Sequence, residues 1–380
     1  MAKTKSVEAF RDDTLQLEAR IIEAIRKEGP QNVSKLSRML GAHQETVRYK
    51  IKSQFRRLGF RIHADVDYRK LGLSLHWATF KFSPGFLGSA NRILAALNET
   101  GYLTYYARII PQGYYIALFA VPTGAGSEYR KFLDHLKRIG MVENFTFKEA
   151  LASRHNSMNP RYFNFRSGMW EVDWNRVRAD PARPLVVEPR KPVATVDKYD
   201  LLIIKELQKD ALQHLVEVGR RLKVNQKTLE YHNRTHVQKE KLIPNYNVRW
   251  TRDMESSVSH SVQLARLTAS GLTTKEFIRL QAAVSKIPFL WAEELLKDGT
   301  YIATLLIPAQ EAVTTFDYLS NEAPNLDTKV SVGYINVRDA CLFTIPYHKF
   351  EEGWSVDQKA LVSDFNRAMT SREKPEASTP

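Results

Sequence analysis

The feature that most constrains this chain is an internal repeat. Residues 22–49 align without a gap with residues 204–231, at a constant offset of 182. At this offset Leu36 aligns with Val218 and Leu40 with Leu222, so apolar positions stay apolar. A chain that carries one structural unit twice can build an approximately twofold-symmetric molecule without a partner subunit. Duplex DNA is the commonest target with that symmetry, so the repeat favours a DNA-binding protein.

Composition agrees with a globular protein that binds a polyanion. The chain has 380 residues, enough for two to three domains, and a formal net charge of +14. Such an excess attracts nucleic acid first and acidic membrane surfaces second. The single cysteine, Cys341, allows no internal disulfide and suits a reducing compartment. Because no secretory signal or membrane-spanning apolar segment is visible, we expect a cytoplasmic protein that does not bind membranes.

Turn residues divide the start of each repeat into three short helices. In the first copy these helices end near Gly29, Gly41 and Gly59, with apolar residues at helical spacing between them. A tight turn between the second and third helices is typical of a helix-turn-helix. Residues 60–67 alternate apolar and polar side chains, which predicts a strand that forms a wing.

The periodicity changes after each helical region. Residues 75–147 read in the order β-α-β-β-α-β, with a hairpin at Gly113, and residues 261–335 repeat this order with a hairpin at Gly299. The predicted fold class is therefore α+β, with two repeats of a winged helix-turn-helix and a ferredoxin-like βαββαβ domain. The predicted boundaries are 15–68 and 72–175 for the first repeat, 176–196 for a linker rich in Pro and Arg, 197–250 and 257–358 for the second repeat, and 359–380 for a C-terminal tail.

The third helix of the first copy is the strongest candidate for a DNA-binding surface. In a helix-turn-helix this helix lies in the major groove, where Gln can pair with adenine and Arg with guanine. Further basic side chains are suited to phosphates. The matching helix of the second copy is more mixed in charge, so its contact with DNA is a weaker expectation. The candidate DNA-binding residues are Gln44, Glu45, Arg48, Tyr49, Lys50, Lys52, Arg56, Arg57, Arg61, Gln226, Lys227, Tyr231, His232 and Arg234.

The succession of helix-turn-helix, wing and βαββαβ unit resembles the Lrp/AsnC (feast/famine) family of transcription regulators, whose RAM domain is the βαββαβ unit. The segment 62–73, with its Asp and Leu-Gly, is similar to the family's link between wing and sensor domain. Family members carry one unit per chain and pair through the sensor domains, so the chain resembles a dimer fused into one polypeptide. The resemblance implies a sequence-specific DNA-binding regulator rather than an enzyme, with double-stranded DNA as its partner. It also implies a small-molecule effector near Gln112, Gly113, Asp298 and Gly299.

Other functions stay open at this point. Siroheme decarboxylases share the architecture and rely on a His-rich aromatic segment in the sensor sheet, but residues 102–110 and 289–296 contain no histidine here. An architectural protein that coats DNA also fits the charge, whereas a plasmid-type replication initiator normally lacks the two hairpins. The ten histidines are scattered, so we expect neither a metal site nor a cofactor. Further assembly of the fused pairs is left undecided by the sequence.

Overall fold

Each half of the chain begins with a module of short helices. The computed structural model describes residues 16–189, 192–250 and 262–370. The first module contains α2 (Leu17–Glu28), α3 (Val33–Leu40), α4 (Gln44–Tyr49), a π-helical turn η1 (Lys50–Gln54) and α5 (Phe55–Arg57). The second contains α9 (Lys198–Lys209), α10 (Leu215–Leu222), α11 (Gln226–His232) and a π-helical turn η4 (Asn233–Gln238). The repeat therefore extends to the π-helical turn that continues the third helix.

Local sequence determines where these helices begin and end. The Asn32 side chain accepts a hydrogen bond from the backbone N–H of Lys35 at 2.9 Å and caps the start of α3. Gly41 ends α3 with φ 61°, a left-handed conformation that favours glycine. Asp197 and Asp200 form a capping box at the start of α9. Gln16 precedes α2 and makes no side-chain cap hydrogen bond among the described residues, so the first helices of the two modules have different N-termini.

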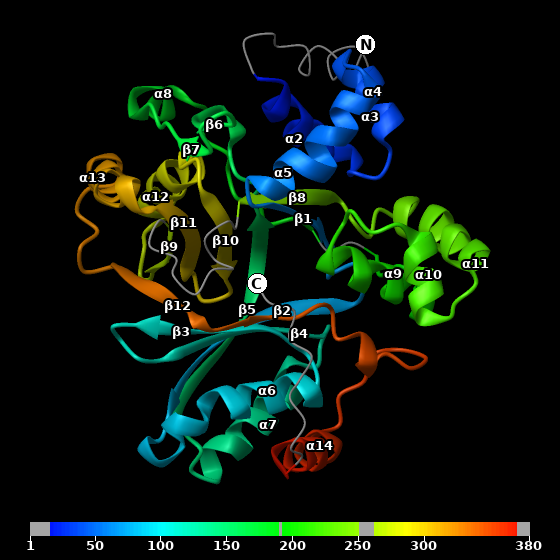
Figure 1. The fold of residues 1–380 in the computed structure, drawn as a ribbon. Helices are drawn as coiled ribbons and strands as arrows, with labels where there is room; N and C mark the ends of the chain where they lie inside the picture. Colours follow the sequence, from blue (N-terminus) through cyan, green and yellow to red (C-terminus); the bar gives the residue numbers. More distant parts are fainter. Residues whose placement is uncertain (1–15, 190–191, 251–261, 371–380) are drawn as a thin grey trace.

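The strand predicted as a wing pairs with the other half of the chain. β1 (Phe60–Asp65) forms an antiparallel two-stranded ribbon with β8 (Asn245–Trp250), with Ile62 opposite Val248. Figure 1 shows this ribbon between the two helical modules. The alternation of apolar and polar residues predicts the strand β1, but no feature of the sequence indicates that it pairs with β8 beyond the linker.

Eight strands, four from each half, form a closed barrel. Around the barrel the order is β10-β11-β9-β12-β3-β4-β2-β5, so each half contributes four adjacent strands. Two antiparallel seams join the halves, one between β5 and β10 and the other between β12 and β3. The strand bounds are β2 (Leu73–Phe82), β3 (Leu103–Ile110), β4 (Tyr115–Pro122), β5 (Val142–His155), β9 (Val262–Ala269), β10 (Leu290–Leu296), β11 (Tyr301–Pro308) and β12 (Val330–Leu342).

Helices cover the outside of the barrel. α6 (Ala90–Thr100) and α7 (Gly126–Arg138) lie on the first half's strands, and α12 (Thr274–Lys286) and α13 (Ala312–Glu322) on the second half's. Side chains alternate between the two faces of each strand. In β2, Ala78 and Phe80 pack toward the helices, whereas Trp77 faces the barrel interior.

The hydrophobic cores cross between the halves. One core runs from the first helical module through residues 158–177 to the helix-covered face of the second half's strands. Another runs from the second helical module to the helix-covered face of the first half's strands. The barrel interior forms a third, smaller core. Because each module shares a core with the other half's strands, the two halves stabilise one another.

Shorter elements connect these parts. They are the 3-10 turns η2 (Pro84–Ser89), η3 (Pro160–Tyr162), η5 (Ala309–Glu311) and η6 (Tyr347–Lys349), the strands β6 (Phe163–Asn164) and β7 (Met169–Trp170), and the helices α8 (Trp174–Ala179) and α14 (Gln358–Thr370). α14 falls in the segment predicted as a tail, yet its Phe365 is fully buried and packs edge-on against Phe132 of α7. The predicted start of the second βαββαβ domain at residue 257 and the last ten residues lie outside the described residues.

The structure is thus a mixed α+β fold built around an eight-stranded barrel. Among the described residues, no helix combines the length and the apolar character that a membrane span requires.

Candidate functional site

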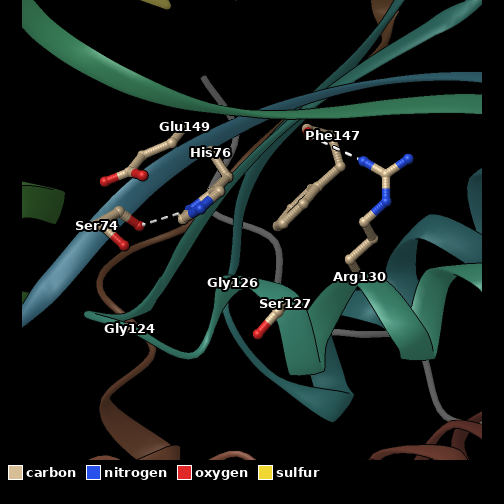
Figure 2. Close-up of a pocket in the computed structure, with 8 residues that line it drawn as sticks. All are labelled: Ser74, His76, Gly124, Gly126, Ser127, Arg130, Phe147 and Glu149. Atoms are coloured by element: carbon tan, nitrogen blue, oxygen red, sulfur yellow. Dashed lines mark hydrogen bonds between the residues drawn. The ribbon is translucent and has the colours of Figure 1, made fainter. Parts of the chain in front are cut away.

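A cleft lies where the first half's strands meet the start of α7. Its volume is about 370 Å³, and Figure 2 shows the side chains that line it. They come from β2, from β5, from the turn that leads into α7 and from the first residues of α7, and they are Ser74, His76, Gly124, Gly126, Ser127, Arg130, Phe147 and Glu149. The cleft therefore combines an imidazole, a guanidinium, a carboxylate and a hydroxyl.

His76 is the buried polar group of this cleft. Its ring stacks on Phe147, with 4.6 Å between the ring centres and 9° between the ring planes. Nδ1 lies 3.2 Å from the carbonyl oxygen of Ser74, which can only accept a hydrogen bond. Nδ1 therefore carries the proton, and Nε2 is left with a lone pair. Burial lowers the pKa of His76 below its ordinary value of 6.5, so the imidazole is neutral at neutral pH.

The start of α7 faces the imidazole. A Cβ added to Gly126 would lie 2.8 Å from His76 Nε2, so the helix backbone and the ring are in close approach. No side chain caps α7, and its first N–H groups carry the partial positive charge of a helix N-terminus. The Ser127 hydroxyl adds another donor at this end of the helix.

Two charged groups complete the walls. The Arg130 guanidinium donates to the carbonyl oxygen of Phe147 at 3.4 Å and lies 5.5 Å from the centre of the Phe145 ring. Glu149 is opposite His76 in the register of β2 and β5, and Lys297 of the second half lies 3.7 Å from its carboxylate. The negative charge in the cleft thus has a counter-ion, whereas Arg130 makes no ion pair under 4.0 Å among the described residues.

The arrangement is suited to a carboxylate. The helix N-terminus, the Ser127 hydroxyl and Arg130 are donors for an anion. A carboxylate bound next to His76 would favour the imidazolium over the neutral ring, because an opposite charge raises the pKa of a histidine. An acid group bound at the start of α7 would lie beside the His76 imidazole, whereas Arg130 lies on the other side of the Phe147 ring in Figure 2.

The close approach at Gly126 gives a first prediction. Gly126→Ala is expected to displace the imidazole, because the added Cβ would lie 2.8 Å from Nε2. Leaving its buried position should raise the pKa of His76 toward 6.5, as measured by an NMR titration of the ring protons. Gly85→Ala is the matched control, since no atom lies within 4 Å of a Cβ there. Equal His76 pKa values in both variants would show that the ring does not depend on this contact.

A second group of buried charges lies inside the barrel. The Arg266 guanidinium lies 4.0 Å from the centre of the Trp77 ring. Strand register makes these two residues equivalents, because Trp77 pairs with Leu118, Arg266 pairs with Thr304, and residues 118 and 304 keep the hairpin offset of 186. Glu294 is buried nearby, and desolvation raises its pKa to about 7. Within the described part of the chain, Arg266 Nη1 and Glu294 Oε2 have no hydrogen-bond partner, so this cluster carries uncompensated polar atoms.

Three of the basic residues proposed to contact DNA from the first module, Lys50, Lys52 and Arg56, make contacts within the chain. Lys50 Nζ lies 2.6 Å from Glu18 Oε1, and both side chains are mostly buried. Arg56 forms an ion pair with Asp210 at 3.2 Å, and Lys52 lies 3.3 Å from His214. Gln44, Arg48 and Lys52 also line a second cleft, of about 530 Å³, between the two helical modules.

The remaining predicted site residues lie apart from the candidate cleft. In the second module Gln226 donates to Glu230 at 2.6 Å, and His232 lies 3.0 Å from Asp200. Gln112 donates weakly to the carbonyl oxygen of Val332, and Asp298 pairs with Lys148 at 2.5 Å. The turns at Gly113 and Gly299 thus each contact the opposite half. Positions on the basic helices also include Glu45, Tyr49, Arg57, Arg61, Lys227, Tyr231 and Arg234, in the elements α4 to β1 and α11 to η4.

Repeated helical modules, a cross-paired ribbon and a barrel of two four-stranded halves make an Lrp-like α+β fold. No protein-family model matches the chain, and no curated protein sequence matches it.

Solved structures that are similar to this fold include two of siroheme decarboxylase NirDL. One is similar with a TM-score of 0.55 and 13% identity, over 92% of this chain and 99% of that chain. The same enzyme in complex with an iron-uroporphyrin III analogue gives a TM-score of 0.54 and 11% identity, over 93% of this chain and 99% of that chain. At these identities the similarity establishes the fold.

This comparison corrects the sequence-based prediction of function. The predicted DNA-binding transcription regulator, and the prediction that the chain is not an enzyme, are wrong: the fold is shared over almost the whole chain with an enzyme. The ion pairs of Lys50 with Glu18 and of Arg56 with Asp210 give a physical reason for the wrong prediction. Basic side chains on a helix can stabilise the protein itself and need not indicate a nucleic-acid partner. The family resemblance agrees with the observed Lrp-like fold, whereas the regulator function that it implied is not supported.

Sequence reasoning missed His76 and Arg130 as site residues. His76 is one of ten histidines that are scattered along the sequence. It lines the same cleft as Arg130 because α7 begins at Gly126, earlier than the apolar periodicity indicates. The sequence signal was the segment Gly124-Ala125-Gly126-Ser127 ahead of an amphipathic helix. Glycines before a helix suggest a close approach to its N-terminus.

Proposed function

We propose that this chain is an enzyme that binds a carboxylated tetrapyrrole and removes carboxylate from it, as a siroheme decarboxylase does. The observation that carries the proposal is the cleft of Figure 2, where a buried neutral imidazole faces an uncapped helix N-terminus. The similarity in fold to siroheme decarboxylase NirDL supports the substrate class. A tetrapyrrole with several carboxylates also suits a chain whose net charge is +14.

The cleft accounts for the steps that a decarboxylation needs from a protein. A side-chain carboxylate of the substrate binds the N–H groups at the start of α7, the Ser127 hydroxyl and Arg130. The bond between the methylene carbon and the carboxylate carbon breaks, carbon dioxide leaves, and the electron pair stays on the methylene carbon next to the conjugated ring. A proton from the His76 imidazolium then converts that carbon to a methyl group. One proton is consumed for each carbon dioxide released.

The position of the histidine differs from the pattern expected of siroheme decarboxylases. Residues 102–110 and 289–296, which become β3 and β10, contain no histidine. His76 lies in β2, one of the strands of the same four-stranded half, and would supply the imidazole from there. The proposal therefore assigns the acid–base role to a different strand.

We also infer the finer architecture that goes with this function. Each half would consist of a winged helix-turn-helix (15–68 and 197–250) and a ferredoxin-like domain (72–175 and 257–358), joined by the linker 176–196. The strand orders β3-β4-β2-β5 and β10-β11-β9-β12 support this division. A fused pair of this kind would need no second chain to complete the cleft.

Binding can be tested by titrating the purified chain with iron uroporphyrin III. We expect a shifted Soret band that saturates. Arg130→Gln removes a charge-assisted hydrogen bond and should weaken binding by about 1.5–3 kcal/mol, roughly 10-fold or more. Arg138→Gln, which changes an exposed arginine at the other end of α7, is the matched control and should leave the titration unchanged.

Turnover is tested by incubating the chain with siroheme without oxygen and following loss of carbon dioxide by mass spectrometry. His76→Gln should lower the rate by about 100-fold or more, the effect typical of removing a general acid. The control His135→Gln lies in the last turn of α7, outside the cleft. Tetrapyrrole binding without any decarboxylation, or full activity of His76→Gln, would refute this assignment.

A further inference from the structure

Four metal-ligating side chains meet in the second helical module, away from the cleft. Asp197 and Asp200 come from the start of α9, and His232 and His236 come from α11 and η4. One potential ligand atom from each residue lies within 4.8 Å of the others. Asp200 is fully buried, so its carboxylate is not solvated by bulk water.

Three distances within this group are close to those between ligands around one ion. His232 Nδ1 lies 3.0 Å from Asp200 Oδ1 and 3.5 Å from Asp197 Oδ2. His236 Nδ1 lies 3.0 Å from Asp200 Oδ2. Tetrahedral zinc with bonds of about 2.0–2.2 Å separates its ligand atoms by roughly 3.3–3.6 Å. The four groups need only small adjustments to reach that geometry.

Backbone hydrogen bonds already orient the two carboxylates. Asp197 Oδ1 accepts from the N–H groups of Tyr199 and Asp200, which leaves Oδ2 directed toward His232. Asp200 Oδ2 accepts from the N–H of Asp197 at 3.0 Å. Such contacts behind the ligands fix their direction and strengthen a metal site.

The first module provides an internal comparison at the offset of 182. Asp200, His232 and His236 correspond to Glu18, Lys50 and Gln54. There the Lys50 ammonium lies 2.6 Å from the Glu18 carboxylate, and Gln54 donates to the same oxygen at 3.1 Å. A lysine thus supplies the positive charge that the buried acid of the first module requires.

The second module lacks that lysine. The ion-pair partners of Asp200 in the described part of the chain are the two imidazoles, which carry no charge when neutral. A buried carboxylate without a counter-charge is costly. A metal ion bound by both carboxylates and both imidazoles would place a positive charge beside Asp200, at the position that the Lys50 ammonium occupies in the other half.

We propose that Asp197, Asp200, His232 and His236 form a binding site for one divalent transition-metal ion, with zinc the best match. Two imidazoles exclude magnesium and calcium, which take oxygen ligands. Four protein ligands leave no open position, as in structural zinc sites. The ion connects α9 to α11 and stabilises the second module only.

Metal content of the full chain tests the site. The chain is stripped with a chelator, incubated with zinc or cobalt(II), desalted and measured by elemental analysis and absorption spectroscopy. We expect about one ion per chain and the intense visible bands of tetrahedral cobalt. His236→Gln introduces the glutamine that the first module has at this position. Substituting a residue that only hydrogen-bonds to a ligand typically weakens metal binding roughly 10–100-fold, so loss of a ligand itself should weaken zinc binding by more than that.

Two further variants separate loss of the site from loss of folding. His232→Lys combined with His236→Gln and Asp200→Glu rebuilds the first module's Lys–Glu–Gln cluster, and it should stay folded while binding no metal. His135→Gln in α7 controls for removal of a histidine elsewhere and should keep one ion per chain. The proposal is overturned if wild type binds no ion after loading, if His236→Gln binds as tightly as wild type, or if cobalt shows only weak octahedral bands.

Discussion

Replacing Arg154 with methionine is expected to lower the free energy of unfolding by about 3–5 kcal/mol, because it leaves a buried carboxylate without its counter-charge. Arg154 of β5 is paired in register with Glu293 of β10, at a seam between the halves. Its Nε donates to Glu293 Oε1 at 2.9 Å, and Glu293 is fully buried. In the variant, Gln281 and Tyr301 would still donate hydrogen bonds to Oε2 of this carboxylate.

Urea unfolding of three variants distinguishes this explanation from a general loss of packing. Lys81→Met removes an exposed ion pair with Glu143 and should cost less than about 1 kcal/mol. Adding Glu293→Gln to Arg154→Met removes the unpaired charge and should recover part of the lost stability. A cost for Arg154→Met as small as that of Lys81→Met would mean that the seam does not depend on this ion pair.

Glu294→Gln is expected to make the protein more stable relative to wild type as the pH rises from 5 to 8. Desolvation raises the pKa of Glu294 from 4.5 to about 7, while Arg266 and His155 oppose this shift and Glu293 adds to it. The folded state therefore holds the proton more tightly than the unfolded state. Wild-type stability is fully present below pH 4.5 and falls as the pH rises toward and through 7.

The size of this effect follows from the pKa difference. At about 1.4 kcal/mol for each pKa unit, ionisation of the buried Glu294 costs roughly 3 kcal/mol, and most of that cost arises between pH 5 and 8. Glutamine does not titrate, so the stability difference between variant and wild type should grow by about 2–3 kcal/mol over that range. Urea titrations at both pH values measure it. Parallel pH profiles for the two proteins would place the carboxylate in contact with water.

The repeat made part of the fold predictable. Glycine turns, amphipathic helices and hairpins such as those at Gly113 and Gly299 have local signals, so the element order could be read from the sequence. The pairing of β1 with β8 across the linker could not be predicted, because neither strand has a sequence feature that identifies its partner. α14 is not predicted by the sequence analysis, which assigns residues 359–380 to a C-terminal tail, although Phe365 and Leu361 are buried.

The candidate sites were less predictable than the fold. His76 and Arg130 acquire their relation from the packing of α7 on β2, and Asp200 meets His236 only when α9 and η4 cross. From the sequence, His232 was predicted to contact DNA, and the scattered positions of the ten histidines predicted no metal site. The excess of basic residues suggested a nucleic-acid partner, but some of these residues, such as Lys50 with Glu18, form ion pairs within the protein.

Fusion of the two halves has a consequence for residues on the approximate twofold axis. In a homodimer every substitution is made twice, so a charged residue beside the axis always meets its own copy. Here Trp77 faces Arg266, its equivalent, and Glu294 occupies the position that Ala107 holds in the first half. Because one gene encodes both halves, a residue can change in one half while the equivalent residue of the other half stays the same. The two halves can therefore place different side chains at equivalent positions, which identical subunits cannot do.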